Sequence, residues 1–257
     1  MSPTKRPLPN DPDMYAKVNF DLFALSAYYW PGHCTASNTQ IPACSKFPTG
    51  ANWNNNLVVH GLWPGYTAKY AGTTWGKGPY GDKPPEHGGP KLPCNGALYN
   101  PETFPKDATS LNVFPKDGVS DGDFHAYQWN KHGICAQMDQ ANYWNKAVQL
   151  GQLANRVFAG VVAALTPATK TMHRSITLAA LQQKLGPHAQ PTCFQRVGEK
   201  RQILWFINFC YKRASGVGGA IVCPPVKVTD QTGKETDAKS NCWPDKPIEL
   251  PLLPGQQ

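Results

Sequence analysis

The sequence has no apolar run long enough to span a bilayer, and residues 1–7 lack the apolar core of a signal peptide. It contains neither a Cys-x-x-Cys nor a His-x-x-x-His pair, so the usual spacings of a zinc site are missing. No internal repeat or linker-like stretch divides the 257 residues. These absences favour a single domain without a membrane span, and we expect neither a metal nor another cofactor.

The chain is also poor in acidic residues, with 17 Asp and Glu against 25 Lys and Arg. The formal charge of +8 would attract a polyanion such as RNA, a heparan-like sugar or an anionic surface, although many secreted proteins are basic. The eight cysteines favour disulfide bonds and an oxidising compartment. We therefore expect a secreted protein, or a vacuolar, lysosomal or periplasmic one, from which a signal peptide was removed and to which Met1 was added.

The order of polar and apolar residues predicts an α+β fold. Residues 1–16 are polar and proline-rich and are expected to form a flexible arm before a single domain over 17–257. Periodicity and residue type predict two helices and several strands, namely helices over 141–165 and 178–185, strands over 18–29 and 202–210, and edge strands over 220–223 and 248–250. The expected architecture is a central, mostly antiparallel sheet with packed helices and long ordered loops such as 66–109.

One stretch, residues 127–135, places an imidazole, an ammonium and an amide close together. If it is helical, Gln128 and His132 are four residues apart and share one face, with Lys131 beside them. Gly133 is then expected to be the left-handed residue that ends the helix, and Cys135 could tie this end to a distant strand. The alternative is an ordinary helix end whose basic last turn satisfies the helix dipole.

A second stretch, residues 57–66, is interpreted as a short apolar strand that places His60 at its end. A glycine, the aromatic residue Trp63 and a turn follow. A histidine at the end of a strand is well placed to face a cleft. Trp63 is interpreted either as a base-stacking residue or as a core residue under the turn, and the two interpretations are about equally supported.

The two stretches together closely resemble the two active-site signatures of the T2-type ribonucleases, through the segments His60-Gly61-Leu62-Trp63-Pro64 and Trp129-Asn130-Lys131-His132-Gly133-Ile134-Cys135. Residues 20–26, with Trp30, Pro31 and Cys34, are similar to the first core strand of that family. The similarity runs loosely from 19 to 242 and is sharp only in the two signatures. It implies a metal-independent endoribonuclease that acts on single-stranded RNA. We also expect the protein to be a monomer.

The resemblance implies a role for each site residue. It makes His132 the general base and His60 the general acid, which the sequence alone does not distinguish, and it leads to a 2′,3′-cyclic phosphate and then a 3′-phosphate. Lys131 and Gln128 would stabilise charge on the phosphate. The implied substrate-binding residues are Trp63, Tyr127, Phe124 and Tyr66. The implied disulfide pairs are Cys94–Cys135, Cys193–Cys242, Cys210–Cys223 and Cys34–Cys44. Phe124 and Tyr66 are the weaker stacking candidates, and His33, His87, His173 and His188 match no motif and are treated as surface or structural residues.

Three residues depart from the family pattern. Gln128 stands where a glutamate is expected, Tyr127 where many members have a third histidine, and Gly65 where an aspartate is common. We therefore predict an active enzyme, slower than typical members, with a relaxed or shifted base preference. The alternative is a secreted RNA-binding, polyanion-binding or cytotoxic protein with weak catalysis, although such a protein would not need His60, Lys131 and His132 together.

Overall fold

The computed structural model describes residues 20, 22–36, 44, 54–65, 97–106, 121–165, 173–195, 201–213, 219–229 and 235–252. The predicted arm over 1–16, Tyr66, Cys94 and most of the loop 66–109 lie outside these residues. Within the described residues, no helix combines the length and apolarity that a bilayer crossing requires.

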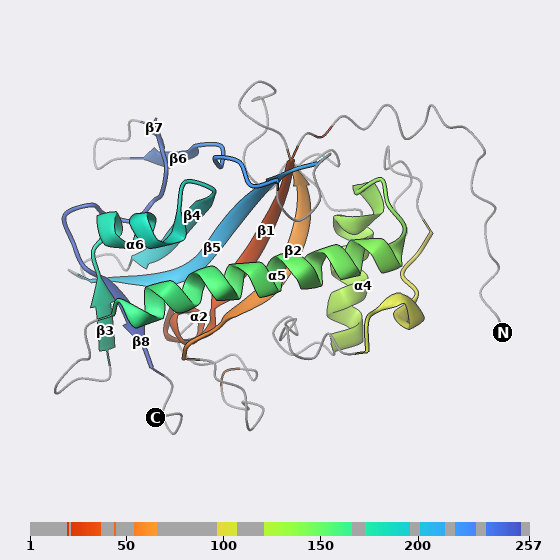
Figure 1. The fold of residues 1–257 in the computed structure, drawn as a ribbon, viewed down its shortest axis with the longest axis horizontal. Coiled ribbons are helices and arrows are strands. Elements are labelled where there is room, and N and C mark those ends of the chain that lie inside the picture. Colours follow the sequence, from red (N-terminus) through yellow and green to blue (C-terminus); the bar gives the residue numbers. More distant parts are fainter. Residues whose placement is uncertain are drawn as a thin grey trace.

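The described residues form the following elements in chain order (Figure 1): β1 (Leu22–Tyr29), α2 (Trp30–Ala36), β2 (Leu57–Gly65), η2 (Pro101–Thr103), α4 (Asp121–Lys131), η4 (Gly133–Cys135), α5 (Gln140–Ala163), β3 (His173–Ile176), α6 (Leu178–Leu185), β4 (Ala189–Gln195), β5 (Gln202–Lys212), β6 (Val226–Thr229), β7 (Glu235–Ala238) and β8 (Ile248–Pro251). The elements labelled η are short 3-10 helices. The helix predicted over 178–185 has these bounds in the structure, and that predicted over 141–165 is α5.

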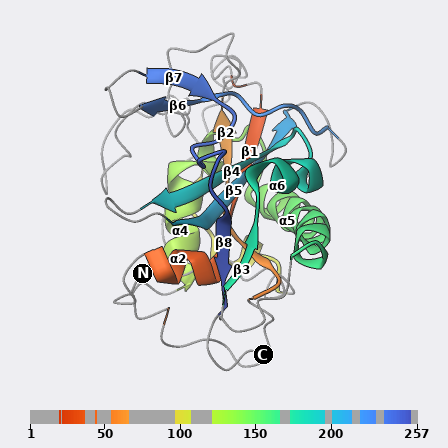
Figure 2. The same cartoon turned by 90° about the vertical axis from the view of Figure 1, so that its left-hand side faces the viewer.

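The main sheet confirms the predicted fold class. Its strands follow the order β2-β1-β5-β8-β3, and β4 pairs with the other edge of β5. Among the described strand pairs, only β5 and β8 run parallel. The β6–β7 hairpin forms a separate two-stranded sheet beyond one end of the main sheet (Figure 2).

Two predicted edge strands differ from the structure. The segment 248–250 lies inside the sheet as β8, because β1 pairs with β5 only over 206–212 and leaves the start of β5 open on that edge. The segment 220–223 makes one isolated bridge, between Ala220 and Tyr211, and is not a strand. Neither result follows from residue type, because both depend on where the neighbouring strand ends.

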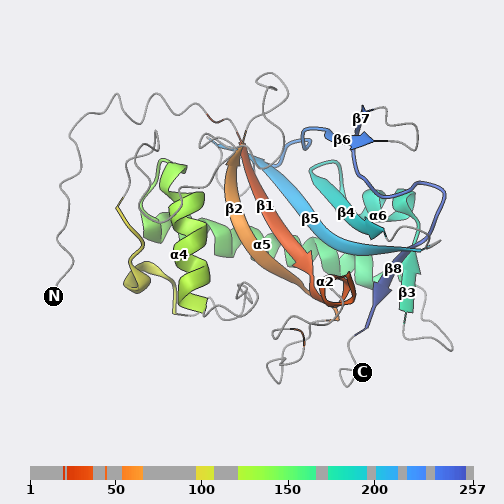
Figure 3. The ribbon, with the colours of Figure 1, turned by 180° about the vertical axis from the view of Figure 1, so that it is seen from behind.

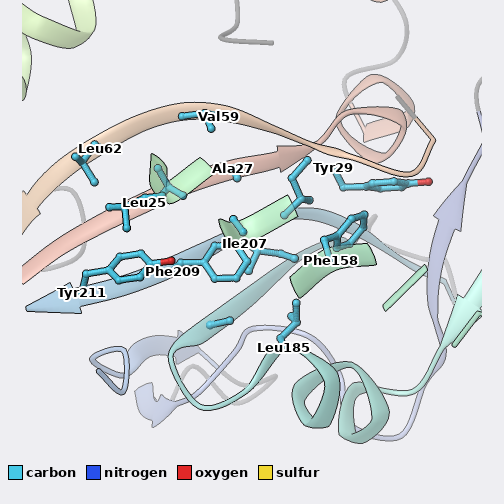
Figure 4. Packing of buried hydrophobic residues seen from close by; sticks show 14 of the residues in the cluster. Leu25, Ala27, Tyr29, Val59, Leu62, Phe158, Leu185, Ile207, Phe209 and Tyr211 are labelled. Atoms are coloured by element: carbon cyan, nitrogen blue, oxygen red, sulfur yellow. The ribbon is translucent and has the colours of Figure 1, made fainter. Parts of the chain in front are cut away.

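The core lies between one face of the sheet and helix α5, which crosses that face along much of its length (Figures 1 and 3). Alternate residues of β1 point into it because side chains of a strand alternate between faces. Figure 4 shows these residues against Phe158 of α5, with Leu185 of α6 beside them. Burial of such large apolar side chains contributes about 1.5 to 3 kcal/mol each and holds the helix on the sheet.

Disulfide bonds connect cysteines that are 10, 49 and 13 positions apart in the chain. The bonds join Cys34 to Cys44, Cys193 to Cys242 and Cys210 to Cys223, which are the pairs that the resemblance implies. Cys135 is also disulfide-bonded, and its implied partner Cys94 lies outside the described residues.

Helix α5 also holds β2 through polar side chains. Asn155 accepts a hydrogen bond from the Leu57 amide at 2.6 Å and donates one to the Leu57 carbonyl at 3.1 Å. Farther along, the Tyr143 hydroxyl donates to the Leu62 carbonyl at 2.8 Å. The two anchors fall on either side of His60, so the helix fixes the segment of β2 that carries this histidine.

Replacing Asn155 with alanine is expected to lower the free energy of unfolding by about 1 to 3 kcal/mol, because both backbone groups of Leu57 lose their partner. Chemical denaturation measures the change. Gln152→Ala, at an exposed position on the same helix, is the control and should change stability little. Equal losses in the two variants would contradict the role given to Asn155.

Candidate active site

A β-bulge places His60 in the site. The register pairs Ser26 with Gly61 and Ala27 with Val59, so His60 is the extra residue of β2. Bulges of this kind redirect side chains, and here the residues after the bulge change faces. Leu57, Val59 and Leu62 therefore belong to the core, whereas the rings of His60 and Trp63 lie together outside it, 5.6 Å apart.

This arrangement corrects the prediction that His60 ends its strand. Strand β2 continues from Leu57 to Gly65, and His60 lies within it. Pro64 is tolerated in the second half because β2 is an edge strand of the described sheet, where a missing backbone donor costs little. The cleft-facing position that a strand end would provide is provided by the bulge instead.

The opposite wall is one face of α4. Phe124, Gln128 and His132 are spaced by four residues and share this face, as helical geometry requires. All three are buried, with exposed fractions of 1%, 0% and 4%. The His132 amide still donates to the Gln128 carbonyl at 2.9 Å, so the imidazole is held at the helix end.

Gly61 allows these walls to approach each other, and Gly133 allows close packing at the end of α4. A Cβ on Gly61 would lie 2.3 Å from Gln128 Oε1 and 2.6 Å from Trp63 Nε1. A Cβ on Gly133 would lie 2.4 Å from the Trp129 ring. Gly133 does not take the left-handed conformation predicted for it, because among the described glycines only Gly186 has a positive φ. It is needed for close packing and not for a chain reversal.

The Gln128 amide bridges the two walls. Trp63 Nε1 donates a hydrogen bond to Gln128 Oε1 at 3.0 Å. The other end of the amide, Gln128 Nε2, lies 3.5 Å from His60 Nε2. A single buried side chain therefore links the indole and the imidazole of β2 to helix α4.

Lys131 and Tyr127 form a pair on the neighbouring stripe of α4. Lys131 Nζ donates to the Tyr127 hydroxyl at 2.8 Å and lies 5.1 Å from the centre of the Tyr127 ring. The phenol thus holds the ammonium in one place without neutralising it. This charge acts on both site histidines.

Both histidines resist protonation. Burial, followed by the nearby His33 and Lys131, lowers the pKa of His60 to about 3. Burial also lowers the pKa of His132 well below its ordinary value, followed by the effects of Lys131 and His60. Desolvation penalises the charged imidazole, and neighbouring positive groups add to that penalty. The two rings act on each other and are neutral at neutral pH.

The predicted substrate-binding residues lie in different surroundings. Trp63 is half-buried and stacks on His132, with ring centres 5.1 Å apart at 28°, so one face of the indole is already covered. Phe124 is buried and packs on the His60 ring at 5.2 Å, which makes it a packing residue in this structure rather than a surface for stacking a base. Tyr66 lies outside the described residues.

Sequence reasoning did not single out the aromatic residues behind His60. The Tyr28 ring lies edge-on to His60 at 4.8 Å and to His33 at 4.7 Å. Trp205 Nε1 donates to His33 Nδ1 at 2.9 Å. The strand alternation of β1 could have placed Tyr28 outside the core, whereas its ring contact with His60 depends on the bulge and could not be read from the sequence.

His125 was also missed, although it lies beside Phe124 in the sequence. It is buried and stacks on Phe104 at 3.9 Å. It also lies 5.7 Å from the Trp144 ring, so it packs on the side of α4 that faces α5. Within the described part of the chain, no three His, Cys, Asp or Glu residues are grouped so that they could hold a metal ion.

A search against protein-family models matches residues 20–217 with the ribonuclease T2 family, which is most of the chain. The chain belongs to the ribonuclease T2 family. It is therefore an endoribonuclease of the T2 type, and the resemblance seen in the two signatures is confirmed. A search of curated proteins finds no match to this sequence.

Solved structures of T2 ribonucleases share the fold. Ribonuclease MC1 from bitter gourd seeds has a TM-score of 0.57 and 18% identity, with 89% of this chain and 99% of that chain covered. The self-incompatibility associated SF11-RNase of Nicotiana alata has a TM-score of 0.53 and 16% identity, with 90% and 98% covered. Japanese pear S3-RNase has a TM-score of 0.56 and 16% identity, with 90% and 100% covered. Structures of ribonuclease MC1 mutants contain 5′-GMP or 5′-UMP.

Gly61→Ala in this T2 ribonuclease is expected to lower the free energy of unfolding by about 1 to 3 kcal/mol, because the added methyl group overlaps the Gln128 amide. Thermal or urea denaturation measures the loss. Gly160→Ala is the matched control, since nothing lies within 4 Å of its Cβ on the exposed side of α5. That change should raise stability by up to about 1 kcal/mol. A stable Gly61→Ala variant would refute the close approach.

Stability is expected to fall as the pH falls below about 6.5. The folded pKa of His132 lies below its unfolded value, so its contribution is complete above the unfolded pKa and is lost as the pH falls toward the folded pKa. The loss should therefore grow as the pH falls from 7 to 5. Urea denaturation at both pH values tests this, with His132→Gln expected to lose less than the unchanged protein. An equal loss in both would count against the buried neutral imidazole.

Proposed function

We propose that this T2 ribonuclease is a secreted, metal-independent enzyme that cleaves single-stranded RNA by transesterification. His132 removes the proton from the ribose 2′-hydroxyl, whose oxygen attacks the adjacent phosphorus. The bond to the 5′-oxygen breaks, and His60 donates a proton to that leaving oxygen. Water then opens the 2′,3′-cyclic phosphate to a 3′-phosphate.

The observation that carries this proposal is the meeting of His60 and His132 around Trp63. The histidines come from different parts of the fold and are 72 positions apart in the chain, yet both rings contact the same indole. His60 also lowers the pKa of His132 by its charge. Gln128, on the helix that leads to His132, lies 3.5 Å from His60 through its amide nitrogen. Two neutral imidazoles on opposite sides of a phosphodiester suit acid–base catalysis once one of them is protonated.

Lys131 supplies the positive charge for the transition state in this proposal. Negative charge grows on the phosphate oxygens during attack, and a fixed ammonium lowers the energy of that state. The Tyr127 hydroxyl keeps Lys131 in place at 2.8 Å. Tyr127 thereby acts on the phosphate through Lys131, although its hydroxyl can also donate a hydrogen bond directly.

Base binding is proposed for the surface around Trp63, through the indole face that His132 does not cover. Stacking on an aromatic ring contributes about 1 to 3 kcal/mol and tolerates every base, which fits a relaxed base preference. The nucleotides bound in the ribonuclease MC1 structures support a nucleotide as ligand.

The disulfide bonds support an extracytoplasmic location. We also propose that the chain acts as a monomer, with residues 17–257 as one domain.

The second candidate is a polyanion-binding protein with weak catalysis. It is favoured by the burial of His132, the low proton affinity of both histidines and the presence of Gln128 in place of a glutamate. The net charge of +8 would serve binding alone. The retention of both histidines with Lys131 supports the first candidate, since binding by charge does not require imidazoles.

His60→Ala and His132→Ala are each expected to reduce RNA cleavage at least about 100-fold, because each removes one acid–base group. Cleavage is measured in EDTA by mass-resolved digestion, which also reports the end groups and the base preference. Gln152→Ala, on the exposed side of α5, is the control for general effects of mutation.

Full cleavage by either histidine variant would reject the mechanism. Loss of cleavage in EDTA by the unchanged protein would reject metal independence. Tight RNA binding without cleavage by the unchanged protein would favour the second candidate.

A further inference from the structure

The Trp63 indole determines which way the Gln128 amide points. Nε1–H of an indole can only donate a hydrogen bond, so the group that faces it at 3.0 Å must be the amide oxygen. The amide nitrogen then faces His60 Nε2 at 3.5 Å. Rotating the amide by half a turn would set two donors against each other inside a buried site, which is costly.

We propose that Trp63 and Gln128 form a positioning pair that holds His60 as a neutral ring, with its Nε2 lone pair toward the amide and its proton on Nδ1. An amide N–H can only donate, so it is compatible with His60 Nε2 only while that nitrogen carries no proton. The inference rests on the proposed function for its importance in catalysis. The hydrogen-bond logic itself depends only on the three side chains.

The other groups around His60 act in the same direction. Helix α4 presents Phe124 and Lys131, β1 presents Tyr28, α2 presents His33, and His132 follows α4. Two neighbouring groups shift the pKa of His60 by their charge. They are His33 and Lys131, and both are basic. A glutamate at position 128 would supply a negative charge and accept a hydrogen bond from protonated His60, whereas glutamine supplies neither.

This arrangement specifies where the proton for the leaving group comes from. In the free enzyme His60 is neutral, and it must take one proton from solvent before it can donate one to the 5′-oxygen. The bound phosphodiester provides the negative charge that makes this uptake favourable. After the transfer His60 is neutral again, and the 2′-hydroxyl proton remains on His132. RNA binding and proton uptake are therefore coupled in this enzyme.

The ring state can be read directly from the full chain by NMR of ¹⁵N-labelled protein, because the two imidazole nitrogens differ in shift with tautomer and charge. His60→Gln identifies the His60 signals. In the unchanged protein at pH 7, His60 should be neutral with its proton on Nδ1. Trp63→Phe keeps an aromatic ring but frees the amide to rotate, so a mixture of tautomers should appear. Trp129→Phe is the matched control.

Trp129→Phe also loses one indole hydrogen bond, at 2.8 Å to the Ala97 carbonyl, but leaves the Gln128 amide untouched. It should keep the His60 tautomer of the unchanged protein. Gln128→Glu should raise the pKa of His60 by about 1 to 3, because a carboxylate replaces the amide. It should also move the pH optimum of RNA cleavage upward. Gln128→Met removes the amide donor that faces His60 and keeps the Trp63 side chain. It should also give a mixture of His60 tautomers, so it replaces Trp63→Phe if that variant does not fold.

Two results would overturn the inference: a His60 proton on Nε2 in the unchanged protein, or an unaltered Nδ1 tautomer in both Trp63→Phe and Gln128→Met. RNA cleavage measured on the same samples separates this failure from failure of the proposed function. Absent cleavage with the expected tautomers would reject the function and keep the positioning pair. Normal cleavage with the His60 proton on Nε2 would keep the proposed function and reject the positioning pair.

Discussion

The close approach of helix α4 to strand β2 is the constraint on which the site depends. The approach is possible because Gly61 has no side chain where the Gln128 amide lies. It places Trp63 and His60 of the strand against Gln128 and His132 of the helix region. Helix α5 also holds the strand, through hydrogen bonds that join its Asn155 and Tyr143 side chains to the strand backbone. The site is thus assembled by packing, before any substrate is present.

That packing sets the electrostatics of the site. Excluding water from two imidazoles lowers the pKa of both, and Lys131 acts in the same direction. Among the described residues, the charged groups that lower both pKa values are basic. In the proposed function an RNA phosphate supplies the opposite charge, and the net charge of +8 attracts such a chain over longer distances.

The local parts of this structure could be predicted from the sequence, and the parts that depend on pairing could not. Helix α6 was predicted with its bounds because its apolar spacing and Gly186 are local signals. The bulge at His60 depends on the register with β1, set by residues more than 30 positions earlier. The position of Gly133 was identified but not its reason, because the Trp129 ring that excludes a Cβ is a three-dimensional neighbour. Tyr28 was missed for the same cause.

Gln128 illustrates how a family signature can be kept while its chemistry changes. A glutamate at this position would accept a hydrogen bond from Trp63 and another from protonated His60. Glutamine preserves the first bond and reverses the second, because its nitrogen can only donate. The side chain fills the same space, so the fold places no obstacle to the exchange. In the proposed mechanism, the histidines and the lysine of the signature therefore carry out the reaction, whereas Gln128 sets the protonation state of His60 from which the reaction begins.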